Sequence, residues 1–145
     1  MLTTGNAAAN NMKNTRKIIV IEDDRDISEL IAYNLRQQGY FCEQVFSGLD
    51  AVDELKRKPF EIIILDLMLP GIDGFDICRE LKSEGDNPRR FIIVVSARNS
   101  AEDKVYANML GANMYLTKPF KVAQLIEAVD EIDGLLDKEY LVKSR

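Results

Sequence analysis

The sequence predicts an α/β fold in which a doubly wound, five-stranded parallel sheet carries helices on both faces. Three observations support this fold class. Segments with strand-like and helix-like spacing of apolar residues alternate five times along the 145 residues. The strand-like segments are nearly uninterrupted aliphatic runs, which indicates burial on both faces and therefore a parallel sheet. No linker or internal repeat divides the chain, so we expect one compact domain.

The first part of the chain is expected to form two strands and two helices. In order, these are a buried strand in residues 17–24, a helix in 25–39, a strand in 40–46 and a helix in 47–59. Gly39 lies where the first helix should end, and Ser47 is suited to cap the second. In the first helix the apolar residues that recur near helical spacing are Ile27, Leu30, Ile31, Tyr33 and Leu35.

The rest of the chain continues the alternation. It is expected to contain a strand in 60–66, a helix in 74–85, a strand in 89–97, a helix in 100–111 that ends at Gly111, a strand within 113–120 and a last helix in 121–140. The apolar residues expected to face the core are Phe75, Ile77, Cys78 and Leu81 in the first of these helices, and Val122, Leu125, Ile126, Val129 and Ile132 in the last.

Composition narrows the functional class. A net charge of −5 argues against non-specific binding to nucleic acid or to an anionic membrane. The chain lacks an apolar run of membrane-spanning length and the apolar core of a signal peptide, so we expect it in the cytoplasm. The absence of histidine excludes serine–histidine hydrolases and His-ligated zinc. Cys42 and Cys78 sit among apolar residues and are expected to be small core residues.

The chemistry of the chain should lie where its strands end. In an open parallel sheet, ligands bind beyond the carboxyl ends of the strands, at the point where the strand order reverses. For strand order 2-1-3-4-5, the first and third strands are neighbours there, so Glu22, Asp23 and Asp66 should converge. Three carboxylates repel one another unless a hard cation such as Mg²⁺ lies among them. Asp24 is expected to cap the following helix instead.

Two further strand ends supply groups that suit a phosphoryl ligand. Lys118 follows the fifth strand and offers a positive charge, and Ser96 ends the fourth strand and offers a hydroxyl. With no histidine available, the natural nucleophile is a carboxylate. We therefore expect Asp66 to attack a phosphorylated donor and become an aspartyl phosphate.

Four motifs carry a family resemblance. IVIEDD, IIILDLMLPGIDGFDICREL, IIVVSAR and GANMYLTKPF resemble, in this order, those of the response-regulator receiver domain, the chemotaxis-regulator-like phosphoprotein of two-component systems. The resemblance covers residues 16–137 and implies the flavodoxin-like strand order 2-1-3-4-5. Residues 1–15 would then be a disordered lead-in, and residues 138–145 a tail or the start of a linker.

The resemblance also implies a role for each site residue. Asp66 is the expected phosphorylation site. Mg²⁺ (or Mn²⁺) would be bound by Glu22, Asp23, Asp66 and the backbone carbonyl of Met68. Ser96 and Lys118 would bind the phosphoryl group, and Tyr115 would occupy the aromatic switch position. The Lys118–Pro119 bond is expected to be cis.

The implied partners follow from the same resemblance. A sensor histidine kinase or phosphotransfer protein would supply a phosphohistidine, and an unknown downstream protein would read the surface formed by the fourth helix, fifth strand and fifth helix. A phosphorylation-dependent dimer is one form this readout can take. The chain would catalyse only its own phosphorylation and dephosphorylation, and it would bind neither nucleic acid nor membrane. Met68 and Arg98, two residues after Asp66 and Ser96, are poorly suited to position an attacking water, so slow dephosphorylation is expected.

Other functional classes stay open at this point. A degenerate receiver would act as a docking module without phosphorylation. A haloacid-dehalogenase-like phosphatase also uses a strand-end Asp with Mg²⁺, but it needs a second Asp where this chain has Met68. A flavodoxin-like cofactor binder would have to cradle a phosphate against the acidic loop at Glu22. The Asn113-Met114 pair and the acidic last helix depart from regulators with a winged-helix output and put their usual dimer in doubt.

Overall fold

The computed structural model describes residues 16–83 and 90–144, and within them it forms one parallel sheet with helices between the strands. The strands are β1 (Lys17–Ile21), β2 (Phe41–Val45), β3 (Ile62–Leu65), β4 (Phe91–Ser96) and β5 (Met114–Thr117). The helices are α2 (Arg25–Gln37), α3 (Gly48–Arg57), α4 (Gly74–Ser83), α5 (Ala101–Met109) and α6 (Val122–Ser144). The strand order β2-β1-β3-β4-β5 confirms the predicted fold class. The predicted lead-in at residues 1–15 lies outside the described residues.

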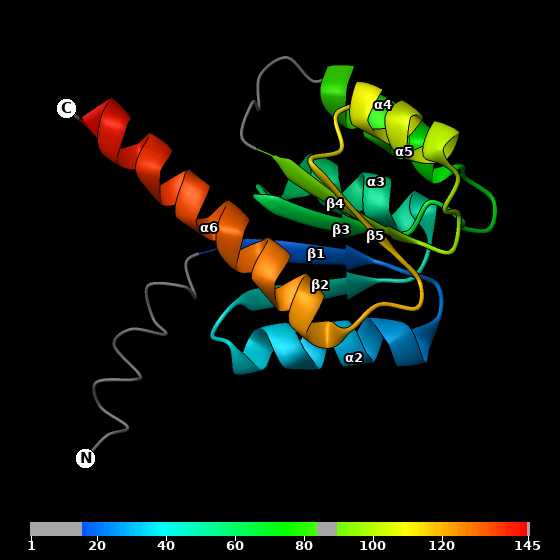
Figure 1. Cartoon of the computed structure of the whole chain (residues 1–145), viewed down its shortest axis with the longest axis horizontal. Coiled ribbons are helices and arrows are strands. Elements are labelled where there is room, and N and C mark those ends of the chain that lie inside the picture. The colour runs from blue at the N-terminus through cyan, green and yellow to red at the C-terminus, as the bar shows by residue number, and fades with distance from the viewer. Residues whose placement is uncertain (1–15, 84–89, 145) are drawn as a thin grey trace.

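The sheet separates two apolar layers (Figure 1). Helices α3, α4 and α5 cover one face, and α2 and α6 cover the other. Successive residues of β1 point to opposite faces, so Ile19 packs in the first layer and Ile18 and Val20 in the second. Burial on both faces explains why the strands are aliphatic throughout.

The N-caps predicted for α2 and α3, and the glycines predicted to end α2 and α5, are present in the structure. The Asp24 side chain accepts hydrogen bonds from two backbone N–H groups at the start of α2, and the Ser47 side chain accepts one at the start of α3. Gly39 and Gly111 follow α2 and α5 with φ angles of 95° and 107°, a conformation that glycine adopts without strain. The N-cap and C-terminal predictions are confirmed.

Helix α2 is rotated relative to the simplest expectation from its apolar residues. Leu30 and Tyr33 are 48% and 57% exposed, so these two apolar residues do not join the core. The buried face instead consists of Ser28, Ile31, Ala32 and Leu35. Ser28 can be buried because its Oγ accepts a hydrogen bond from the Gln44 side-chain amide at 2.9 Å. Ser28 therefore lies in the core because it has a hydrogen-bond partner, although its polarity alone would predict that Leu30 or Tyr33 is buried instead.

The acidic residues of α6 serve partly as internal partners. The Arg16 guanidinium contacts Asp133 at 2.6 Å and Glu61 at 3.0 Å, which ties the start of β1 to α6 and to the segment before β3. The Tyr40 hydroxyl donates to Asp130 at 2.5 Å. The helix continues through Ser144, past the expected end at residue 140. Of the helices in residues 16–83 and 90–144, none is both long and apolar enough to cross a membrane.

Candidate functional site

Parallel register places the four predicted strand-end residues along one edge of the sheet. Ile21 pairs with Leu65 across β1 and β3, so Glu22 and Asp66 both follow immediately. Ser96 pairs with Thr117 across β4 and β5, so Lys118 comes next to the end of β4. Backbone hydrogen bonds continue the ladder by one residue, from Asp66 N–H to the Ile21 carbonyl at 3.0 Å and from Lys118 N–H to the Ser96 carbonyl at 2.8 Å. The sheet therefore fixes the backbone of the site.

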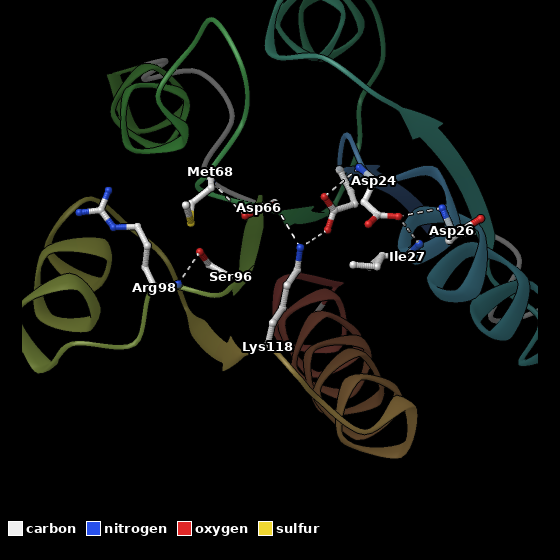
Figure 2. A network of polar contacts seen from close by, with 9 residues as sticks. Asp24, Asp26, Ile27, Asp66, Met68, Ser96, Arg98 and Lys118 are labelled. Carbon is white, nitrogen blue, oxygen red and sulfur yellow. Dashed lines mark hydrogen bonds and ion pairs between the residues drawn. The ribbon is translucent and has the colours of Figure 1, made fainter.

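Lys118 lies between two buried carboxylates (Figure 2). Its Nζ contacts Asp66 Oδ2 at 3.1 Å and also pairs with Glu22 Oε1. Glu22 and Asp66 are only 2% and 5% exposed. The Lys118–Pro119 bond is cis, as the resemblance implied. The structure thus brings together the ammonium group of Lys118 and two carboxylates at the ends of three strands, where burial would make an unpaired charge costly.

The charges of this group shift one another's pKa. Burial raises the pKa of Glu22 to about 7, and the negative charge of Asp66 adds to this effect, although the Lys118 ammonium opposes it. Burial tends to lower the pKa of Lys118, but the bonds to Glu22 and Asp66 outweigh it, so this pKa is raised and Lys118 stays protonated. The cluster therefore holds excess negative charge that one ammonium group does not fully balance.

Asp23 completes an oxygen-rich group that fits a hard divalent cation. One carboxylate oxygen from each of Glu22, Asp23 and Asp66 can be chosen so that all three lie within 4.8 Å of one another. Asp23 is exposed, which leaves this side of the group open to water. Carboxylate and water oxygens are the ligands that Mg²⁺ and Mn²⁺ prefer, so this group suits such a cation.

The loop after Asp66 packs tightly against its carboxylate. The backbone N–H of Met68 donates to Asp66 Oδ1 at 2.9 Å, while the Met68 side chain is 55% exposed. Gly74, the first residue of α4, lies against this loop. A Cβ at position 74 would come within 2.5 Å of Leu67 Cα and 2.9 Å of the Asp66 carbonyl oxygen. The absence of a side chain at Gly74 thus allows α4 to begin directly beside the site.

Ser96 and Tyr115 meet at the loop that leaves β4. Ser96 is fully buried, and its Oγ accepts the backbone N–H of Arg98 at 3.2 Å. The Tyr115 hydroxyl donates to the carbonyl of the same Arg98 at 2.6 Å. The backbone of Arg98 therefore links the predicted hydroxyl ligand to the predicted aromatic switch.

A wide surface hollow of about 660 Å³ opens beside this cluster. Its walls include Asp23 on one side, Met68 and the loop up to Asp73, and Arg98. The Arg98 guanidinium contacts Asp103 Oδ1 at 2.9 Å and lies 5.1 Å from the centre of the Phe75 ring. In Figure 2 the Arg98 guanidinium lies on the far side of Met68 from Asp66 and points away from Asp66.

This fold, with an acidic group at the ends of β1 and β3 and a lysine after β5, defines a class of phosphate-handling signalling domain. The family model for the response regulator receiver domain matches residues 18–130. The chain therefore belongs to the response regulator receiver domain family, a family of two-component signalling domains that interact with histidine kinases and are not conventional enzymes. Its acidic group is consistent with the phosphorylation and metal site of such domains.

Solved structures agree with this placement. The receiver domain of the Francisella response regulator 1452 is 29% identical, with a TM-score of 0.74 over 81% of this chain and 95% of that one. The signal receiver domain of a LuxO repressor protein from Vibrio parahaemolyticus is 27% identical, with a TM-score of 0.81 over 88% and 96%. A BeF3-activated DrrB receiver domain is 28% identical, with a TM-score of 0.75 over 82% and 97%.

Sequence reasoning missed three features of the site. Gly74 was expected only as the first residue of a helix, yet its contact with the backbone beside Asp66 requires a glycine. Asp103 and Phe75 hold the Arg98 side chain, but they lie on α5 and α4, and no sequence spacing relates them to residue 98. The sequence around Gly74, Pro-Gly-Ile-Asp-Gly, is equally typical of an ordinary turn, so it does not by itself indicate close packing against Asp66.

Proposed function

We propose that this chain accepts a phosphoryl group on Asp66 from the phosphohistidine of a partner histidine kinase or phosphotransfer protein. The observation that carries the proposal is the pairing of Lys118 with Asp66 and Glu22 at the strand ends of a receiver domain. Asp66 combines near-complete burial with an Oδ1 oriented by the Met68 N–H and an Oδ2 paired to an ammonium group. Because its carboxylate is held in one orientation before the donor arrives, Asp66 is suited to act as a nucleophile.

The residues that would hold Mg²⁺ or Mn²⁺ are Asp23 and Asp66 directly, Glu22 beside them, and the backbone carbonyl of Met68. When bound, the cation supplies positive charge to the carboxylates and to the incoming phosphoryl oxygens. Asp23 is suited to this role because it is exposed and lines the hollow, whereas Asp24 is occupied as the cap of α2.

In the proposed transfer, an oxygen of the Asp66 carboxylate attacks phosphorus while the P–N bond to the donor histidine breaks. The imidazole nitrogen keeps the electron pair of that bond, and a P–O bond to Asp66 forms. Lys118 is already within 3.1 Å of Asp66 Oδ2, so it can follow the new negative charge with little movement. Ser96 would donate its hydroxyl to the phosphoryl group.

Movement of Ser96 would change the loop that it anchors. Its Oγ would leave the Arg98 N–H, and the Arg98 carbonyl is the acceptor for Tyr115. We infer that this pair of hydrogen bonds couples phosphorylation to the surface of α5, β5 and α6, where a downstream protein or a second copy would bind. Met68 and Arg98 beside Asp66 would keep spontaneous hydrolysis slow, because neither presents a carboxylate or amide to an attacking water.

Intact-protein mass measurement after incubation with acetyl phosphate tests the proposal. One adduct of a single phosphoryl group is expected, dependent on Mg²⁺ and absent in Asp66→Asn, which keeps the shape of the side chain. Asp50→Asn, on the exposed first turn of α3, is the matched control and should still be modified. If wild-type protein forms no adduct with acetyl phosphate, phosphoramidate or a phosphorylated kinase, the chain is a docking module instead.

A further inference from the structure

The side chain of Arg16 bridges one turn of α6, at the edge of the sheet where the strands begin. Its Nε donates to Asp133 Oδ1 at 2.6 Å, and its Nη2 donates to the Asp133 backbone carbonyl at 3.3 Å. The same Nη2 pairs with the Asp137 carboxylate, four residues farther along the helix. Residues four apart lie on one face of an α-helix. One guanidinium group therefore spans a full helical turn, from Asp133 to Asp137.

The guanidinium of Arg16 is also fixed to the sheet. Glu61, just before β3, accepts from Nη1 at 3.0 Å, on the side of the group that does not contact α6. The Arg16 side chain is 12% exposed, whereas that of Asp137 is 64% exposed. A planar guanidinium that already engages several acceptors loses little further freedom with each added hydrogen bond. Arg16 therefore presents a fixed donor to a carboxylate at the exposed end of the helix.

The bridged turn contains the one glycine of α6, Gly134. Glycine is the least favourable residue inside an α-helix after proline. Gly134 is exposed, and a Cβ there would meet nothing within 4 Å, so packing does not require its small size. Among the α6 side chains described up to Lys138, Leu136 is the last that is buried. The helix is thus intrinsically weak close to where its contact with the core ends, and Arg16 bridges this turn.

We propose that Arg16 is a latch that keeps the outer part of α6, residues 137–144, helical and aligned with the domain. Figure 1 shows this part of α6 continuing beyond the sheet. While the latch is closed, Asp133 and Asp137 are held one turn apart and the helix continues across Gly134. When it opens, the turn at Gly134 unwinds first, because it has the lowest helix propensity. A molecule that contacts the outer part of α6 then meets a frayed end in place of a rigid extension of the domain.

Amide hydrogen exchange on the full chain, measured residue by residue with NMR, tests the proposal. Arg16→Gln keeps a polar side chain and removes the charge. In this variant exchange at residues 137–144 should accelerate by about fivefold or more, while exchange in β1 and β3 changes by less than about twofold. The ¹³Cα chemical shifts of residues 137–144 should move toward random-coil values. The shifts report helix content directly, so they remain informative where exchange is already fast.

Two further variants separate the latch from other contacts of α6. Asp137→Asn removes the outer end of the bridge at an exposed position and should reproduce the effect of Arg16→Gln on residues 137–144, so it carries the test if Arg16→Gln proves unstable. Tyr40→Phe is the matched control. It removes the hydrogen bond that the Tyr40 hydroxyl donates to Asp130, one turn before the bridge, and should leave exchange at residues 137–144 unchanged.

The double variant Arg16→Gln/Gly134→Ala tests whether the glycine turn is what the latch holds. Alanine raises helix propensity at that turn, so the double variant should recover most of the lost protection and helical ¹³Cα shift. Unchanged exchange and shifts in both Arg16→Gln and Asp137→Asn, or an equal acceleration throughout the domain, would overturn the inference. No recovery in the double variant would overturn it too, because Arg16 would then hold α6 by docking alone.

Discussion

Glu22 is a carboxyl group whose surroundings work against its own charge. It is buried at the end of β1, and its pKa is raised from 4.5 to about 7, first by burial. Between these two pH values the folded chain keeps a proton that the unfolded chain has released. The free energy of unfolding must therefore fall as pH rises through this window.

The replacement Glu22→Gln should flatten this pH dependence, because the neutral amide does not titrate. In buffer with a metal chelator, wild type is expected to lose on the order of 2 kcal/mol more than Glu22→Gln between pH 5 and pH 7.5. Urea unfolding at several pH values measures the difference. Parallel stability curves for the two proteins would show that Glu22 is ionised throughout.

Gly74 and Gly134 form a natural pair for testing close packing beside the site. In Gly74→Ala the new Cβ would meet backbone atoms at 2.5 and 2.9 Å, which cannot move aside as a side chain does. We expect a loss of about 1–3 kcal/mol. In Gly134→Ala, on the exposed side of α6, the new Cβ meets nothing within 4 Å, and a gain of about 0.5–1 kcal/mol is expected. Urea midpoints should move in opposite directions, and a shift in the same direction would contradict the packing argument.

At the scale of elements, the two acids that follow Glu22 have separable duties. Asp24 Oδ1 accepts from the N–H groups of Asp26 and Ile27 at 3.0 and 3.1 Å and so caps α2. Asp24→Ala should lower the free energy of unfolding by about 1 kcal/mol and leave phosphorylation by acetyl phosphate intact. Asp23→Ala should leave the free energy of unfolding nearly unchanged, because Asp23 is exposed, and should prevent phosphorylation, because Asp23 lies in the acidic group. Loss of phosphorylation in Asp24→Ala at normal stability would reassign the metal ligand.

The edge strand β2 is protected by a side chain of the preceding helix. The Val45 carbonyl faces β1, where it accepts from Glu22 N–H, so the Cys42 and Gln44 carbonyls face outward. Arg36 covers the first of these with two N–H donors, at 3.2 and 2.7 Å. An open strand edge invites pairing with another chain.

Removing this cover should make the chain associate with itself. In Arg36→Ala we expect a sedimentation coefficient that rises with protein concentration, together with a loss of about 1–2 kcal/mol from the missing charged hydrogen bonds. Arg57→Ala provides the matched loss of charge on α3. If both variants sediment alike at every concentration, Arg36 does not protect the edge.

At the scale of the whole molecule, the sequence was sufficient to predict which residues meet at the ends of the strands. Asp66 and Lys118 could be placed together because a parallel sheet collects the ends of its strands at one edge, whatever the details of packing. The rotation of α2 could not be predicted, because burial of Ser28 depends on a partner on another element, Gln44. The Arg16–Asp133 pair joins residues 117 positions apart, and no local pattern indicates it. The same holds for the contact between Arg98 and Phe75, which lie on different elements.

Helix α6 continues well past the sheet that it covers (Figure 1). Its 23 residues extend about 34 Å at about 1.5 Å per residue, whereas the six residues of β4 extend about 20 Å. The helix starts four residues after Lys118 and stays packed on the sheet as far as Leu136, which is 2% exposed, while Arg16 pairs with Asp133 and Asp137. The rest of the helix, from Asp137 to Ser144, extends about 12 Å farther at about 1.5 Å per residue. A bend of about 10° beyond Leu136 would carry the end of the helix through about 2 Å, so this outer part of α6 can change direction without disturbing the core.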